Sequence, residues 1–127
     1  MYLLDTHTLL WFFMGDPRLS ENARQLICDE NQRIFVSIAS LWEISIKHSL
    51  RKLELYDSFE NLFPHLLIQN DFELLEIKIE HLSTLSYLAF AHRDPFDRII
   101  ISQAISEDMT LISSDHIFES YPVNLFR

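Results

Sequence analysis

Acidic residues follow two apolar segments that lie at opposite ends of the chain. Asp5 directly follows residues 1–4, and Asp115 follows residues 110–113. If both segments are parallel strands, the two acids meet where open α/β sheets bind ligands, outside the carboxyl ends of the strands. Clustered carboxylates select hard cations such as Mg²⁺ or Mn²⁺, which activate water for attack on a phosphodiester. A turn or helix-cap role explains either aspartate alone about equally well.

Two further acids share helical stripes with apolar residues. Glu43 lies at helical spacing from Ala39, and Asp97 lies at helical spacing from Ile100. A buried carboxylate is costly unless it is paired or bound to a metal. An ion pair with Lys47 is the alternative explanation. It would explain Glu43 better if this glutamate were exposed than if it lay on the inward face. Asp5, Glu43, Asp97 and Asp115 are therefore predicted to converge at one edge of a sheet.

The segment 92–101 allows a simpler explanation for its two aspartates. Asp94 is a good N-cap, Pro95 suits a first helical turn, and Asp97 complements the helix dipole. Capping explains both aspartates, but it does not explain why Asp97 shares a stripe with isoleucines. We expect capping to dominate at Asp94 and metal binding at Asp97.

Strands and helices are expected to alternate along the whole chain. The strands are predicted at residues 1–4, 34–36, 72–75, 110–113 and 123–125. The helices are predicted at residues 6–13, from the Ser20 cap to 29, from a Ser37 or Ser40 cap to 50, at 59–69 with a kink or restart at Pro64, at 79–89 and at 95–107. This order predicts one α/β domain over residues 1–127, with a mainly parallel sheet.

The composition excludes several kinds of site. The single cysteine, Cys28, can form neither an intrachain disulfide nor a cysteine-based zinc site, and the single glycine, Gly15, excludes glycine-rich phosphate loops. The net charge of −9 argues against a simple nucleic-acid binder but allows a metal-dependent nuclease, because divalent cations neutralise carboxylates. No membrane span or signal peptide is visible, so a cytoplasmic location is expected.

The four segments that carry these acids resemble, in order, the motifs of PIN domains of the VapC-like toxin group. They are LLDTHTLLW at residues 3–11, SIASLWEI at 37–44, HRDPFDR at 92–98, which matches a bacterial subgroup, and LISSD at 111–115. The resemblance implies a three-layer α/β fold and cleavage of RNA with Mg²⁺ or Mn²⁺. By matching position it implies that Asp5, Glu43, Asp97 and Asp115 form the catalytic metal site, with Asp94 as a cap or secondary ligand.

The resemblance also suggests substrate contacts and partners. The hydroxyls of Thr6 and Ser114 are candidates for contact with phosphate, although small polar residues at turns usually act as caps. Arg93 and Arg98 are candidates for holding phosphate, or else contribute surface charge. The histidines near the motifs (His7, His92 and His116) are expected to be structural. Many proteins of this group are toxins that dimerise and are inhibited by an antitoxin encoded alongside them.

Other readings fit less well. A receiver domain would need paired acids after its first strand, where Thr6 and His7 follow Asp5, and a lysine after a late strand. A phosphatase of the haloacid-dehalogenase type would need a second aspartate where His7 stands. A catalytically silent PIN domain that acts as a binding module remains the alternative. Such a module would neither bind Mg²⁺ at these acids nor cut RNA.

Overall fold

Five short strands form one sheet in the computed structural model, which describes residues 1–127. The strands are β1 (Tyr2–Leu4), β2 (Ile34–Ser37), β3 (Glu73–Leu75), β4 (Thr110–Ile112) and β5 (Leu125–Phe126). The helices are α1 (Thr6–Met14), α2 (Glu21–Cys28), α3 (Ile38–Ser49), α4 (Phe59–Gln69), α5 (Ile79–Tyr87), α6 (Pro95–Ser106) and the 3₁₀ helix η1 (His116–Ser120). All strand pairs are parallel, so the predicted α/β class is confirmed.

Local sequence signals set several helix boundaries. Ser20 caps α2 as predicted, and Ser37, rather than Ser40, caps α3. Helix α1 ends at Gly15, whose φ of 63° lies in the left-handed region that favours glycine. Helix α4 continues through Pro64 without a restart. None of the helices is both long and apolar enough to cross a membrane.

Two elements near the carboxyl terminus differ from the prediction. The last strand lies at Leu125–Phe126 rather than at residues 123–125, and η1 was not predicted. Asp115 caps η1 by accepting a hydrogen bond from the backbone N–H of Ile117. A five-residue 3₁₀ helix has little apolar periodicity, so the sequence pattern did not reveal it.

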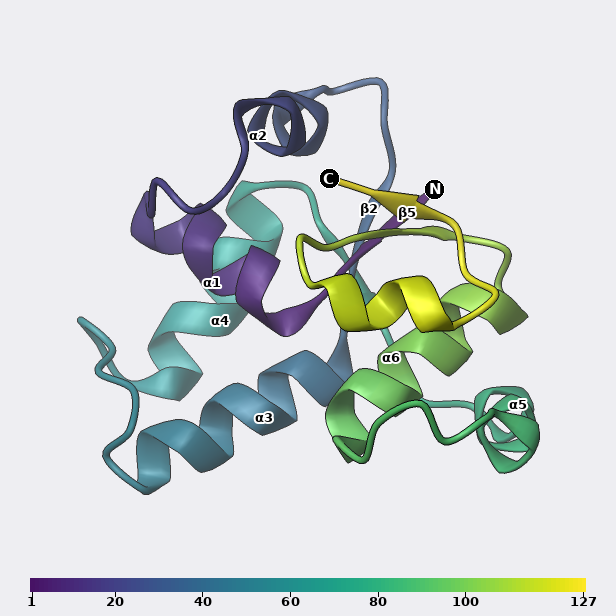
Figure 1. The fold of residues 1–127 in the computed structure, drawn as a ribbon. Coiled ribbons are helices and arrows are strands. Elements are labelled where there is room, and N and C mark those ends of the chain that lie inside the picture. Colours follow the sequence, from purple (N-terminus) through teal and green to yellow (C-terminus); the bar gives the residue numbers. More distant parts are fainter.

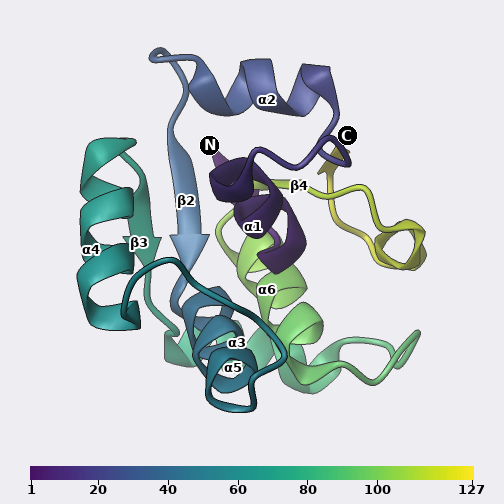
Figure 2. The same ribbon diagram turned by 90° about the vertical axis from the view of Figure 1, so that its left-hand side faces the viewer.

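Helices cover both faces of the sheet and make three layers. Successive strand residues point to opposite faces, so Leu4 and Ile112 pack with α1, α2 and α4, whereas Leu3 and Leu111 pack with α6. Figure 1 shows α1, α2 and α4 on one side of the sheet and α5 and α6 on the other. In the turned view, α3 lies below the arrowhead of β2, at the carboxyl edge of the sheet (Figure 2).

The strand order β3-β2-β1-β4-β5 places β1 at the centre of the sheet. From β1 the chain moves outward through β2 and β3, and then returns to the other side of β1 as β4. The carboxyl ends of β1 and β4 therefore flank the point where the strand order reverses. Crevices at such points are the usual ligand sites of open α/β sheets.

Candidate active site

Asp5 is fixed at the end of β1 by two hydroxyl-bearing residues. Its Oδ1 accepts a hydrogen bond from the backbone N–H of Thr8 at 2.7 Å, and its Oδ2 accepts one from the Ser113 hydroxyl at 2.5 Å. The side chain is only 3% exposed. Burial raises the pKa of Asp5, and the hydrogen bonds from Ser113 and Thr8 oppose that rise. The carboxylate is therefore held in one orientation beside the strand-order reversal.

Glu43 is buried on α3, and only one of its two carboxylate oxygens has a partner. Its Oε2 lies 3.0 Å from Nζ of Lys47, so the ion pair considered from the sequence is present even though Glu43 is 7% exposed. Its other oxygen, Oε1, is buried and has no hydrogen-bond partner. A buried carboxylate oxygen without a partner is costly. A cation that reached this oxygen would remove that cost.

The pKa of Asp97 reflects its burial and the charges of the neighbouring acids. Burial is the largest factor that raises the pKa of Asp97, which reaches about 7. The negative charges that raise it further are those of Asp94, Glu43, Asp5 and Asp115, in that order. Four carboxylates thus act electrostatically on a fifth, and they include the other three acids predicted from the sequence, Asp5, Glu43 and Asp115.

Asp94 and Asp115 border the cluster and act as helix caps. Oδ1 of Asp94 accepts hydrogen bonds from the backbone N–H groups of Phe96 at 2.9 Å and Asp97 at 3.2 Å. Asp115 is exposed at the start of η1, and its backbone N–H donates to the Ser113 hydroxyl oxygen at 3.1 Å. Ser113 therefore connects Asp5, to which it donates, with Asp115, from which it accepts.

The donor set suits Mg²⁺ or Mn²⁺ in its chemistry. All the candidate ligands are carboxylate oxygens, which hard cations prefer, and the unpartnered Oε1 of Glu43 lacks a positive partner. The side chains do not form a closed ligand cage, since no group of three His, Cys, Asp or Glu is arranged to hold one ion. Mg²⁺ usually binds proteins through only one or two carboxylates and keeps several waters. An open arrangement is therefore compatible with Mg²⁺.

The sequence matches the PIN domain family over residues 2–124. The chain belongs to the PIN-domain family. No curated protein shows significant sequence similarity to it.

Solved structures with the same fold include three complexes. The TM-score is 0.74 to VapBC2 from Rickettsia felis bound to a promoter DNA fragment, at 20% identity, covering 98% of this chain and 96% of that one. The TM-score is 0.73 to DNA-bound VapBC from Salmonella typhimurium, at 17% identity, covering 98% of this chain and 96% of that one. It is 0.69 to a toxin–antitoxin complex from Klebsiella pneumoniae, at 16% identity, covering 100% and 97%. At these identities the likeness shows the fold.

The structure of the PIN domain assigns different surroundings to the residues expected to touch substrate. Ser114 and Arg93 are exposed, so both can reach a ligand. Thr6 is buried, and its hydroxyl donates to the Ser40 hydroxyl at 3.1 Å. Thr6 therefore supports the join between α1 and α3, and direct contact with a substrate does not fit its placement.

Arg98 also differs from its expected role. Its side chain is buried, and Nη1 donates to the carbonyl oxygen of Ala89 at 2.7 Å while Nη2 donates to that of Leu88 at 3.2 Å. The guanidinium carbon lies 4.1 Å from the ring centroid of Phe90. Arg98 thus holds the backbone that follows α5 with both of its terminal nitrogens.

The three histidines near the motifs have separate surroundings. His7 is exposed and stacks on Trp11, with ring centroids 5.9 Å apart. His116 is exposed beside Glu119, at 3.5 Å. His92 is half-buried, and its Nε2 lies 3.4 Å from Oδ2 of Asp97. Only His92 contacts one of the clustered acids.

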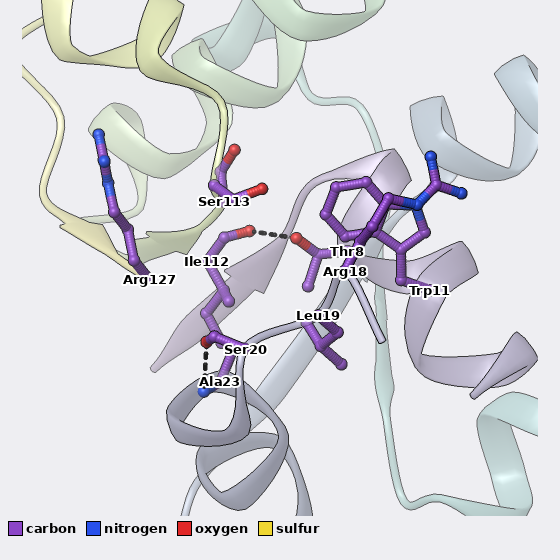
Figure 3. A pocket seen from close by; sticks show the side chains of 10 residues that line it. Thr8, Trp11, Arg18, Leu19, Ser20, Ala23, Ile112, Ser113 and Arg127 are labelled. Carbon is purple, nitrogen blue, oxygen red and sulfur yellow. Dashed lines mark hydrogen bonds between the residues drawn. The ribbon is translucent and has the colours of Figure 1, made fainter. Parts of the chain in front are cut away.

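Ser113 and Thr8 are the residues of this site that the sequence analysis missed. They line a small pocket between the start of α1, the end of β4 and the loop before α2 (Figure 3). The Thr8 hydroxyl donates to the carbonyl oxygen of Ile112 at 3.1 Å, which ties α1 to β4. Strand alternation places Ser113 on the face of Leu111 and Asp5 on that of Leu3, but only the pairing of β1 with β4 makes the two residues neighbours.

Arginines lie on opposite sides of this pocket (Figure 3). The guanidinium carbon of Arg18 lies 5.0 Å from the centroid of the Trp11 ring, and Arg18 forms a salt bridge with Asp16 at 2.7 Å. Arg127 pairs with Glu119. Both cations are therefore already neutralised by acids, and the pocket is not a ready phosphate site.

Proposed function

We propose that this PIN domain is a metal-dependent endoribonuclease and the toxin half of a toxin–antitoxin pair. The observation that carries the proposal is the electrostatic state of Asp97. Its raised pKa reflects burial and four neighbouring carboxylates, an arrangement that repels itself without a cation. PIN domains are generally nucleases, and the family match covers almost the whole chain.

In this proposal several of the acids are ligands of Mg²⁺ or Mn²⁺. Asp5, Glu43, Asp97 and Asp115 are the proposed ligands, and Asp94 is a secondary candidate that mainly caps α6. When bound, the ion supplies an activated water and neutralises negative charge on the scissile phosphate and the leaving oxygen. Ser113 would keep the Asp5 carboxylate in one orientation, through the hydrogen bond to Oδ2.

The substrate contacts are proposed for groups that the fold leaves accessible. Arg93 lies next to Asp94, is exposed and makes no salt bridge, so it can pair with a phosphate near the acids. The exposed hydroxyl of Ser114 can donate to a phosphate oxygen. With a net charge of −9, the chain needs the metal and such local cations to hold RNA.

Metal binding and cleavage test the proposal together. We expect Mn²⁺ to raise the melting temperature, with about 2.7 kcal/mol of stabilisation at a hundredfold excess over its dissociation constant. Asp5→Asn and Asp97→Asn should abolish cleavage of a fluorescent RNA while keeping the metal-free fold. Asp71→Asn, which removes the same charge from an exposed residue, should cut like the wild type.

Two results would contradict the proposal. Wild-type cleavage by both Asp5→Asn and Asp97→Asn would show that the site is elsewhere. A fold that neither binds Mn²⁺ nor cuts RNA would favour the alternative, a silent PIN domain that acts as a binding module.

The toxin assignment and the partners extend the same proposal. Two of the structures with this fold are described as VapBC and one as a toxin–antitoxin complex. We propose a cognate antitoxin for this chain by that likeness, and a homodimer and a cytoplasmic location by the resemblance of its motifs to the VapC-like group. Co-expression with the protein encoded beside it tests the first, since an antitoxin should block cleavage and co-purify.

The exposed apolar residues of α3 and α5 support the homodimer. Trp42 is 57% exposed and Leu82 is 49% exposed, and both line a groove together with Phe96. Apolar surface of this kind commonly marks an interface. Sedimentation at micromolar concentration should show a dimer that Leu82→Glu converts to a monomer. A strictly monomeric wild type would overturn the dimer and leave the nuclease untouched.

A further inference from the structure

The hydroxyl oxygen of Tyr121 lies within hydrogen-bonding distance of three nitrogen atoms. The backbone N of His92 is 3.1 Å away, Nδ1 of the same histidine is 2.7 Å away, and Nη1 of Arg98 is 3.4 Å away. Tyr121 is only 5% exposed. Its hydroxyl must therefore find its partners within the protein.

Counting donors and acceptors fixes the direction of each bond. A tyrosine hydroxyl offers one proton and two lone pairs. The backbone N–H of His92 and the guanidinium of Arg98 can only donate, so they occupy both lone pairs. The hydroxyl proton is left for Nδ1 of His92, which is the shortest of the three contacts. Nδ1 must then be unprotonated, and the proton of the neutral ring must be on Nε2.

The protonated nitrogen is the one that faces the acid cluster. Nε2 of His92 lies 3.4 Å from Oδ2 of Asp97, so its proton points to a carboxylate. The other tautomer would place a bare nitrogen against that oxygen. The His92 ring also packs edge-on against Tyr121, with centroids 5.4 Å apart, and against Phe118 at 6.3 Å. Packing therefore fixes the plane of the ring, and the hydrogen bonds determine which nitrogen faces Asp97.

We propose that Tyr121 is a positioning residue of the acid cluster. It holds His92 as the Nε2–H tautomer, which donates to Oδ2 of Asp97 and so fixes the orientation of that carboxylate. This inference rests on the proposed function, because it concerns the orientation of a proposed metal ligand. Hydrogen-bonded partners of metal ligands typically change metal affinity 10–100-fold when they are removed.

Nitrogen NMR of the metal-free full chain tests the tautomer directly. In ¹⁵N-labelled wild type, His92 should show an unprotonated Nδ1 and a protonated Nε2. Tyr121→Phe should abolish this single state and give a mixture of tautomers or the opposite one. Tyr87→Phe, at an 89% exposed tyrosine, is the matched control and should leave the His92 signals unchanged. A wild-type His92 protonated on Nδ1 would overturn the inference.

Manganese affinity tests the positioning role without measuring activity. It is taken from the Mn²⁺ dependence of the melting temperature, after each variant is shown to fold without metal. Tyr121→Phe and His92→Leu should bind Mn²⁺ about tenfold more weakly, at the lower end for such partners. His92→Gln can place an amide N–H near the position of Nε2 and should recover most of the affinity. Equal affinity in His92→Gln, His92→Leu and wild type would overturn the positioning role.

The two readouts separate this inference from the proposed function. If the wild type binds Mn²⁺ but carries the other tautomer, only the inference fails. If the wild type shows the expected tautomer but is not stabilised by Mn²⁺, the metal site fails, and the positioning role fails with it.

Discussion

The hydroxyl of Ser113 donates a 2.5 Å hydrogen bond to Oδ2 of Asp5, across a separation of 108 positions in the chain. The register of the sheet explains the contact. Leu4 pairs with Ile112 between β1 and β4, so the residues that follow each strand lie side by side. Asp5 is therefore oriented by Ser113, the residue that follows β4, which is the later in sequence of the two neighbours of β1.

Ser113→Ala should weaken the site more than it weakens the fold. The loss of a hydrogen bond to a carboxylate should cost about 1–3 kcal/mol of stability. It should also raise the pKa of Asp5 further, because this bond is the largest factor that lowers it. We expect weaker Mn²⁺ binding and slower RNA cleavage. Ser83→Ala, at an exposed serine on α5, is the control, and equal effects of the two changes would contradict the assignment.

Asp97 should make the metal-free protein less stable as the pH rises. Its pKa is about 7 in the folded protein against 3.8 for the ordinary group, so folding favours the protonated form. This stability is complete below pH 4 and is lost as the pH rises through 7. A pKa difference of one between the folded and unfolded states corresponds to about 1.4 kcal/mol of stability. Asp97→Asn should therefore be more stable than wild type at pH 8.5 by up to about 4 kcal/mol. Melts at pH 5 and 8.5 measure the difference, which should fall by more than half at the lower pH.

Manganese affinity should show the opposite dependence on pH. A bound cation requires the ionised form of Asp97, so binding below pH 7 must displace a proton. We expect the affinity to rise by about tenfold per pH unit up to 7 and then to level off. Mn²⁺ titrations followed by melting at pH 6, 7 and 8 test this. The same affinity at all three would show that Asp97 is not a ligand.

Changes at Asp94 should separate capping from metal binding. Its Oδ1 accepts two backbone N–H groups at the start of α6, so Asp94→Ala should cost about 1 kcal/mol. Asparagine caps about as well, and the lost helix-dipole interaction costs about 0.3–1 kcal/mol. Asp94→Asn should also lower the pKa of Asp97, because the charge of Asp94 helps to raise it. Calorimetry measures the stability, and a large loss of cleavage in an otherwise stable Asp94→Asn would make Asp94 a ligand.

The sequence predicted where Asp5 and Asp97 lie in the fold because their signals are local. Asp5 ends an apolar run and Asp97 lies on an apolar stripe, so strand and helix periodicity place both. The same reasoning failed at Arg98, since arginines are usually exposed and its partners are carbonyl oxygens ten and nine positions earlier. Neither the path of the chain after α5 nor its approach to Arg98 follows from a local pattern.

The choice between Ser113 and Ser114 needed information that adjacent residues do not carry. Both are serines at the end of a predicted strand, and only the pairing of β4 with β1 shows which one reaches Asp5. Tyr121 is a similar case. Its contact with His92 spans 29 positions and depends on the short helix η1, which the sequence analysis did not predict.

The central place of β1 in the sheet also governs how the molecule is made. During synthesis β1 emerges long before β4, which covers one of its edges. Until then β1 has an unpaired edge, and Asp5 lacks both Ser113 and Asp115. Pairing over such a long stretch of chain is entropically slow. The acid cluster therefore requires translation through Asp115, and a chain interrupted before Thr110 cannot assemble it.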